Sequence, residues 1–282
     1  MTAPLLAIRN LTIDYAGHVQ AVRRANLEIR LGEAVGLVGE SGSGKSTLAA
    51  AIPGLLPMSA RIAMGEIAFK GKTITGSGSA AQRALRGDEV AMVFQDPMTA
   101  FNPVLTIGEQ LVDFQSRVPG STAEKYGRAV AMLARVGMPD AALRARSYPH
   151  ELSGGMRQRA AIAAALLVNP SLLIADEPTT ALDVTMEAQI IHLFRELRRD
   201  YGGGILIVTH HLGVVAELCD RVYVMYRGDV VEEGPVDDIF HNPRHPYTRA
   251  LLACDPARLS ERAGYLPVIS EAERATFTRA GA

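Results

Sequence analysis

Apolar residues occur along this chain in short runs that end at glycine, proline or acidic residues. Runs of this kind predict buried strands when turn residues bound them. We expect such strands over residues 34–38, 90–94, 172–175 and 204–209. Segments rich in alanine or leucine follow them and predict helices over residues 48–52, 160–168, 186–199 and 249–253.

Other segments alternate between apolar and polar residues. Residues 5–13 and 25–29 flank Gly17 and predict strands of a small antiparallel sheet. Further strands are predicted over residues 65–69, 222–225 and 229–233, the last two as a hairpin around Arg227 and Gly228. From Thr106 to about Gly137 the periodicity becomes helical, which indicates a helical insertion between the strands of the core.

A glycine-rich stretch, Gly39-Glu40-Ser41-Gly42-Ser43-Gly44-Lys45-Ser46-Thr47, links the first buried strand to a helix. This order is the context that a phosphate-binding P-loop requires. Its glycines let backbone N–H groups turn toward anionic oxygens. Lys45 can reach the β- and γ-phosphates, and Ser46 can ligate Mg²⁺. A glycine–serine linker is the alternative, but a linker would not lie between a buried strand and an alanine-rich helix.

A second candidate anion site begins at Leu152-Ser153-Gly154-Gly155-Met156, just before the helix over residues 160–168. Ser153 is a suitable N-cap, and the glycines expose N–H groups at the helix start. A plain capped helix is the alternative. Two glycines in a first turn lower helix stability, which favours close approach of a ligand.

Polar side chains end three of the predicted core strands. Asp176 and Glu177 close residues 172–175, and adjacent buried carboxylates are unfavourable unless a cation or a reaction needs them. Beside a P-loop, Asp176 is the expected Mg²⁺-side acid and Glu177 the expected residue that orients and polarises water. Gln95 could ligate Mg²⁺, hold that water or be an ordinary loop residue, and His210 could bond the γ-phosphate or be structural. Tyr15 could stack on a purine or pack a turn.

Composition narrows the class of protein. The chain has 282 residues, 48% of them hydrophobic and 21% charged, which suits a globular protein. A net charge of −1 and the lack of a basic run give no argument for nucleic acid. The start has no secretory pattern, and the longest apolar run is too short for a bilayer span. Two lone cysteines, Cys219 and Cys254, fit a reducing compartment. We therefore expect a cytoplasmic or peripheral protein.

These motifs, in this order, resemble the nucleotide-binding subunit of ATP-binding cassette (ABC) transporters over about residues 5–252. The resemblance implies an α/β P-loop NTPase with a RecA-like parallel-sheet core and an N-terminal antiparallel β subdomain. A helical subdomain at about residues 101–165 would be inserted, and residues 253–282 would form a tail.

The resemblance also implies roles for single residues, and order across six sites is not expected by chance. Catalytic roles go to Glu177, the switch histidine His210 and the Q-loop Gln95. Mg²⁺ would be held by Ser46, Gln95 and Asp176. Contacts to ATP are implied for Tyr15, which stacks on adenine, and for Gly39, Ser41, Gly42, Gly44, Lys45, Ser46, Thr47, Asp176, the signature residues Ser153, Gly154 and Gly155, and the D-loop Asp183.

A narrower resemblance is to the oligopeptide/dipeptide importer subfamily, which also includes nickel, glutathione and some sugar importers. It rests on residues 148–151, Met156, Asp96-Pro97, residues 101–103, Asn242-Pro243 and residues 245–249. Met156, one of these subfamily residues, stands in place of the last glutamine of LSGGQ. There are two departures. His211 stands where an acidic residue commonly follows the switch histidine. Many relatives carry a C-terminal cysteine cluster, but Cys254 alone cannot hold one, so we expect no iron–sulfur cluster.

The resemblance implies that two such subunits pair head to tail, with ATP between residues 39–47 of one and residues 153–155 of the other. The second ATPase is expected to be a distinct homologue. Two transmembrane permease subunits would dock near the segment after Gln95, and an extracytoplasmic binding protein would act indirectly. The chain would then lie on the cytoplasmic face of the inner membrane.

Two other classes of protein predict different sequence features. A soluble ABC ATPase of DNA repair or translation predicts a long coiled coil or two cassettes in one chain, and the sequence has neither. A P-loop kinase would need neither residues 153–156 nor His210. An ATPase of a peptide importer therefore remains the leading hypothesis.

Overall fold

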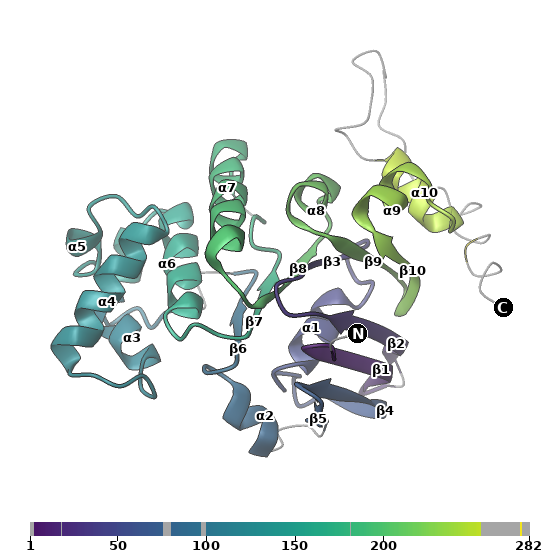
Figure 1. The fold of residues 1–282 in the computed structure, drawn as a ribbon, viewed down its shortest axis with the longest axis horizontal. Coiled ribbons are helices and arrows are strands. Elements are labelled where there is room, and N and C mark those ends of the chain that lie inside the picture. The colour runs from purple at the N-terminus through teal and green to yellow at the C-terminus, as the bar shows by residue number, and fades with distance from the viewer. Residues whose placement is uncertain are drawn as a thin grey trace, which may run out of the picture.

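The computed structural model describes residues 3–17, 19–75, 80–96, 100–180, 182–254 and 277. Two β-sheets form the centre of the molecule (Figure 1). The first has the strand order β10-β9-β3-β8-β7-β6 and consists of β3 (Ala34–Val38), β6 (Val90–Val93), β7 (Leu172–Asp176), β8 (Gly204–Thr209), β9 (Arg221–Tyr226) and β10 (Asp229–Pro235). All its neighbours pair in parallel except β9 and β10. The chain therefore has the parallel core that the resemblance implied.

The second sheet is antiparallel, as the alternating N-terminal segments predicted. Its order is β2-β1-β4-β5, from β1 (Leu6–Tyr15), β2 (Val19–Ile29), β4 (Ala60–Phe69) and β5 (Lys72–Thr73). The strands are longer than the sequence indicated, because pairing continues to the chain reversal. Tyr15, which was expected between strands, pairs with both Val19 and Ala60 at the end of β1.

Helices surround the parallel sheet (Figure 1). They are α1 (Lys45–Ala51), α2 (Ala80–Leu85), α3 (Ile107–Phe114), α4 (Thr122–Arg135), α5 (Ala141–Arg144), the 3₁₀ helix η1 (Pro149–Glu151), α6 (Gly154–Leu166), α7 (Val184–Asp200), α8 (Leu212–Leu218), α9 (Val236–His241) and α10 (Pro246–Ala253). Helices α3 to α6 gather on one side of the molecule, beyond the edge strand β6. None of the helices in the described ranges is long and apolar enough to cross a membrane.

Helices α6 and α10 are among those that begin earlier than their apolar patterns indicated, because caps extend them. Helix α6 starts at Gly154, since the Ser153 side chain accepts a hydrogen bond from the backbone of Met156. Helix α10 starts at Pro246, a residue that the first helical position tolerates. The earlier start of α6 places the signature glycines, Gly154 and Gly155, inside a helical first turn.

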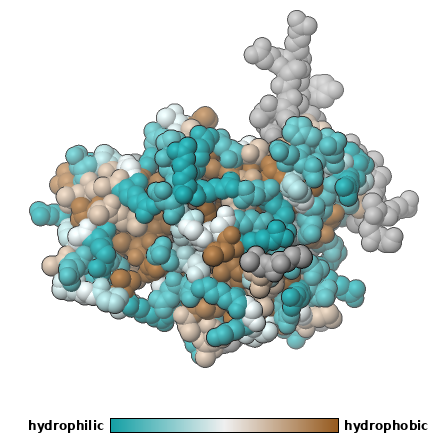
Figure 2. All heavy atoms as spheres, in the orientation of Figure 1, coloured by the Kyte–Doolittle hydropathy of each residue, from teal (hydrophilic) through white to brown (hydrophobic). Residues whose placement is uncertain are grey.

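Alternate residues of the central strands contribute to two hydrophobic cores. Val35 and Leu37 of β3 face α1 and the antiparallel sheet, where Leu48 is fully buried. On the opposite face, the core contains residues of α6, α7 and α8, such as Ile162, Phe194 and Val215. Strands buried on both faces explain the continuous apolar runs of the sequence. Hydrophilic residues cover most of the surface seen in Figure 2, with hydrophobic patches among them.

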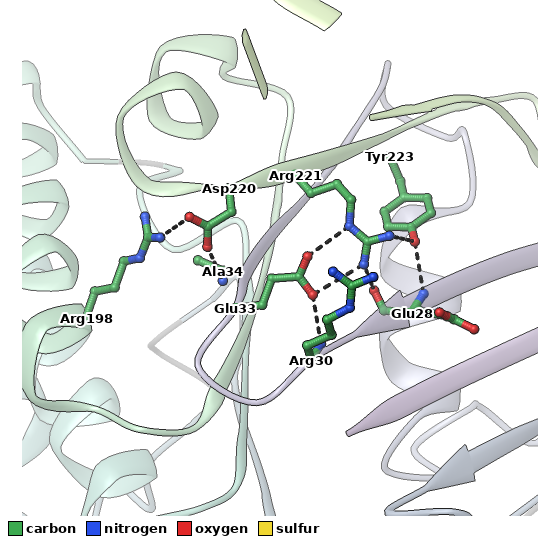
Figure 3. A network of polar contacts seen from close by, with 8 residues as sticks. All are labelled: Glu28, Arg30, Glu33, Ala34, Arg198, Asp220, Arg221 and Tyr223. Atoms are coloured by element: carbon green, nitrogen blue, oxygen red, sulfur yellow. Dashed lines mark hydrogen bonds and ion pairs between the residues drawn. The ribbon is translucent and has the colours of Figure 1, made fainter. Parts of the chain in front are cut away.

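A polar network fastens the turn before β3 to β9 and α7 (Figure 3). Nε of Arg221 donates to Oε1 of Glu33 at 2.9 Å, and the Arg221 guanidinium also reaches the carbonyl of Glu28. Next to it, Asp220 accepts from the backbone N–H of Ala34 at 2.9 Å and pairs with Arg198. Both contacts hold the start of β3, the strand that leads into the P-loop.

Candidate nucleotide site

The P-loop runs from the end of β3 into α1 and is packed tightly on neighbouring strands. Gly39 has φ +152°, and a Cβ there would lie 2.1 Å from the backbone oxygen of Met225 in β9. Gly44 has φ +103°, and its Cβ would lie 2.2 Å from the backbone oxygen of Ala21 in β2. Larger residues would displace the loop at both positions. The glycine spacing thus serves contact with both sheets.

Lys45 is the most buried charged side chain of the loop, with 4% of its surface exposed. Its ammonium donates to the carbonyl of Gly39 at 2.8 Å and to the carbonyl of Glu40 at 2.9 Å. Burial lowers the pKa of Lys45, and the nearby carboxylates of Glu177 and Asp176 oppose this shift. Because an ammonium has three donors, one remains for an anionic ligand.

Ser46 and Asp176 meet where α1 begins and β7 ends. The Ser46 hydroxyl donates to Oδ1 of Asp176 at 3.0 Å. Asp176 is 6% exposed, and burial raises the pKa of its carboxyl, while the Ser46 hydrogen bond lowers it. A hydroxyl and a buried carboxylate are oxygen ligands of the type that Mg²⁺ prefers, so this pair fits the metal that accompanies a nucleotide.

Three side chains that follow strand ends lie around the carboxylate of Glu177. Its Oε2 accepts a hydrogen bond from the hydroxyl of Thr180 at 2.6 Å. Nδ1 of His210, after β8, lies 3.3 Å from the same oxygen, and Nε2 of Gln95, after β6, lies at 3.5 Å. Glu177 itself has φ +47°, an uncommon backbone conformation for a residue with a side chain. Its N–H bonds to the carbonyl of Val208, which holds it there.

A cleft of about 720 Å³ opens above these groups. The lining residues come from the P-loop, the strand ends and the C-terminal helix, and include Gly39, Lys45, Ser46, Gln95, Glu177, Thr180, His210 and Leu251. Ser41, Gly42, Gly44 and Thr47 line it as well. Most of the residues predicted for ATP and catalysis are therefore brought together in one place.

Tyr15 reaches the same region from the antiparallel sheet. Its hydroxyl lies 3.3 Å from Oγ1 of Thr47, at the far end of the P-loop. The aromatic ring is half-buried beside the core that contains α1. Its position relative to the loop agrees with a platform at the base end of a nucleotide, which remains a prediction.

The signature and the D-loop aspartate lie together at a different place. Ser153 caps α6, Asp183 caps α7, and each accepts a hydrogen bond from a Met backbone, Met156 or Met186. A Cβ on Gly155 would lie 1.7 Å from Cε of Met186, so the two helix starts pack directly. Among the described residues that line the cleft, none comes from residues 153–155 or from Asp183. One chain does not unite its signature with its P-loop.

Two side chains of the site had no role assigned from the sequence. Thr180 lies in the turn after Pro178, and no sequence pattern indicates its hydrogen bond to Glu177. Tyr247, known from the sequence only as part of a subfamily motif, accepts a hydrogen bond from the backbone of Glu40 at 2.9 Å. His211, the departure next to the switch histidine, lies with Nδ1 3.3 Å from Glu187. Pro97 and Ala181, and most of the tail over residues 253–282, fall outside the described residues.

Comparisons with protein families and curated proteins agree with this geometry. The model of the family "ABC transporter" matches residues 22–180, and that of the "oligopeptide/dipeptide transporter, C-terminal region" matches residues 231–278. The chain is 48% identical to the oligopeptide transport ATP-binding protein OppD of Salmonella typhimurium, over 94% of this chain and 80% of that protein. It is 47% identical to the dipeptide transport ATP-binding protein DppD of Bacillus subtilis, over 89% and 77%.

Solved structures of ATP-binding cassettes share the fold. A dimeric post-hydrolysis state of the cassette MJ0796, bound to ADP and Pi, aligns with a TM-score of 0.73 and 30% identity, over 82% of this chain and 98% of that one. CbiO1 from Clostridium perfringens, part of the transporter complex cbiONQ, aligns with a TM-score of 0.74 and 29% identity, over 86% and 92%. With a P-loop, a carboxylate-centred cleft and these relatives, the chain belongs to the ABC transporter family, as one of its ATP-binding subunits.

Proposed function

We propose that this chain hydrolyses ATP to energise an importer of dipeptides or oligopeptides. The observation that carries the ATPase part is the convergence of Gln95, Thr180 and His210 on the carboxylate of Glu177, next to Lys45 and Ser46. The peptide part rests on the relatives, whose names refer to oligopeptide and dipeptide transport, and on the C-terminal family match.

In this proposal the P-loop binds the phosphates of ATP. Backbone N–H groups of residues 39–47 face the anion, and the third donor of Lys45 reaches the β- and γ-phosphates. Ser46 and Asp176, with Gln95 nearby, hold Mg²⁺, which neutralises phosphate charge when bound. Tyr15 stacks on the adenine ring.

Glu177 orients and polarises the attacking water. Its oxygen atoms lie in the cleft, and Thr180 and His210 fix the direction of the carboxylate through Oε2. The left-handed backbone at Glu177 is held by the Val208 carbonyl, which keeps the side chain at the mouth of the loop. His210, 45% exposed, is free to contact the γ-phosphate on the other side.

The complete catalytic site requires a second chain. Residues Ser153, Gly154 and Gly155, with Asp183, form a surface apart from the P-loop of the same chain, so they are placed to cover ATP bound by a partner. Closing this interface excludes water and adds N–H donors to the γ-phosphate. We propose that the partner is a distinct homologous ATPase, in a head-to-tail dimer.

The remaining proposals concern the assembly. The ATPase pair would dock on two transmembrane permease subunits at the cytoplasmic face of the inner membrane, and a binding protein on the opposite side would deliver the solute. The ATPase domain would span residues 5–252, with its helical subdomain over about residues 101–165 and the tail from residue 253. The two cysteines of this sequence cannot hold an iron–sulfur cluster by themselves, because a cluster needs four thiolates or their equivalents.

The test is uptake by the assembled importer, reconstituted in vesicles with its permease subunits and binding protein. Labelled di- and tripeptides should enter only when Mg·ATP is supplied on the side of this chain, and a non-hydrolysable ATP analogue should not support uptake. ATP-driven uptake of nickel, glutathione or a sugar, with no peptide uptake, would overturn the peptide assignment but not the ATPase.

A further inference from the structure

The C-terminal helix α10 contacts the P-loop directly, although about two hundred residues separate them in the chain. Tyr247, whose side chain is fully buried, directs its hydroxyl toward Glu40 and accepts the backbone N–H at 2.9 Å. Leu251 and Cys254, one and two turns further along, line the cleft itself. The C-terminal region therefore forms part of the wall of the nucleotide site.

One peptide unit receives two constraints at this point. The unit that joins Gly39 to Glu40 donates its N–H to Tyr247, and its carbonyl, that of Gly39, accepts from the ammonium of Lys45 at 2.8 Å. The ammonium of Lys45 is held by this carbonyl and by the carbonyl of Glu40, which accepts at 2.9 Å. The Tyr247 hydroxyl consequently acts on Lys45 through a single peptide group.

Tyr247 is itself held firmly. Its ring packs on Tyr226 with centroids 4.3 Å apart and on Phe277 at 5.6 Å. Its backbone N–H donates to Nδ1 of His245, and the N–H groups of Arg244 and His245 donate to the carboxylate of Glu232. Burial lowers the pKa of His245, which keeps the ring neutral and its Nδ1 an acceptor.

We propose that Tyr247 is a positioning residue for ATP binding, which orients the Gly39–Glu40 peptide and, through it, the ammonium of Lys45. This inference rests on the proposed function, since it assumes that the P-loop binds ATP. Loss of the hydroxyl removes the hydrogen bond from the Glu40 N–H to Tyr247 and weakens the control of the peptide orientation. A single hydrogen bond of this kind corresponds to about a five- to tenfold change in affinity.

The same aromatic cluster supplies a matched control. Tyr226 packs on Tyr247 with the two rings tilted by 34°, and its buried hydroxyl makes no hydrogen bond with any described residue. Tyr226→Phe therefore removes a hydroxyl from the same cluster without touching the P-loop. A purely structural effect of hydroxyl loss would appear in both variants, whereas a positioning effect is specific to Tyr247→Phe.

The experiment measures ATP dissociation constants and thermal midpoints of the full chain by calorimetry, for the wild type, Tyr247→Phe and Tyr226→Phe. The expected result is a five- to tenfold weaker ATP affinity for Tyr247→Phe, with Tyr226→Phe within twofold of the wild type. Equal affinities in all three, even with a lowered midpoint for Tyr247→Phe, would overturn the inference and leave the proposed function intact. Equal loss in both variants would also overturn it. A wild-type chain that bound no ATP would contradict the proposed function as well.

Discussion

The hydroxyl of Thr180 donates a hydrogen bond of 2.6 Å to Oε2 of Glu177, the same oxygen that lies 3.3 Å from Nδ1 of His210. One contact comes from the turn after β7 and the other from the end of β8. Together they fix the carboxylate on one oxygen and leave the other for water. The carboxylate that we propose as catalytic is thus oriented within a single chain.

Substitution of Thr180 should therefore slow hydrolysis without weakening ATP binding. Thr180→Val keeps the shape of the side chain and removes the donor, so the Glu177 carboxylate can turn away from the water. We expect a tenfold to hundredfold lower kcat in the assembled complex, because small misplacements of a reacting group have effects of this size. Thr180→Ser retains the hydroxyl and should keep most of the rate. Equal rates for Val and Ser would show that the bond has no part in catalysis.

Asp176→Asn should raise the stability of the fold and remove the contribution of Mg²⁺ to ATP binding. Burial raises the pKa of Asp176 in the folded chain, so the folded state holds a proton that the unfolded chain has already lost. The free energy of unfolding therefore falls as pH rises from the ordinary pKa of an aspartate through the raised one. Above the raised pKa the full penalty is present.

The neutral amide removes this penalty and can still accept from Ser46. Without nucleotide, Asp176→Asn should be more stable by about 1 kcal/mol in urea unfolding at pH 7. Its Mg²⁺-dependent gain in ATP affinity should disappear, because a carboxylate ligand is lost. A less stable variant with normal Mg²⁺ dependence would contradict both the burial argument and the metal assignment.

Gly154→Asp tests whether the signature serves the site of another chain. A Cβ at Gly154 meets nothing within 4 Å, and an acid in the first turn of α6 is favourable to the helix. The fold should be unaffected. A carboxylate there would repel the γ-phosphate of ATP bound by the partner, so turnover at that site should fall at least about a hundredfold.

ATP binding by the isolated variant should be unchanged, because its own P-loop lies elsewhere. Gly154→Ala provides the control, because it adds a methyl group without a charge, and its turnover should be higher than that of Gly154→Asp. Weaker ATP binding by isolated Gly154→Asp would mean that the signature and the P-loop of one chain share a site.

The network of Arg221 should contribute measurably to stability. Arg221 and Glu33 are 19% and 12% exposed, and their contact fixes the turn before β3 (Figure 3). Arg221→Met leaves Glu33 without its partner in a largely buried position, and we expect a loss of about 2 to 3 kcal/mol in urea unfolding. Adding Glu33→Gln should restore part of it. An additive further loss in the double variant would contradict the pairing.

The sequence predicted those parts of the site that are encoded locally. A glycine-rich loop between strand and helix, and acids at the end of a buried strand, carry their chemistry in consecutive residues. The sequence predicted the ends of the helices and strands less well, because caps such as Ser153 and pairing partners such as Ala60 determine where they lie. The signature was placed correctly at a helix start. Its separation from the P-loop of the same chain was implied only by the resemblance, since that separation depends on tertiary packing.

Contacts over long sequence separations gave no signal at all. The hydrogen bond from Glu40 to Tyr247 and the left-handed backbone of Glu177 depend on the packing of β9, α10 and β8 around the site. Neither periodicity nor residue type predicts contacts of this kind. Tyr247 was visible only as one residue of a motif, and its contact with the P-loop required the folded chain.

We propose above that Glu177 activates water at an ATP site completed by a second chain. Glu177→Gln in the assembled importer tests this role directly, with the corresponding glutamate of the partner ATPase replaced in the variant and reference complexes alike. We predict that the variant binds ATP as tightly as the reference, while hydrolysis falls at least about a hundredfold and peptide uptake stops. Hydrolysis at the rate of the reference complex would contradict the account.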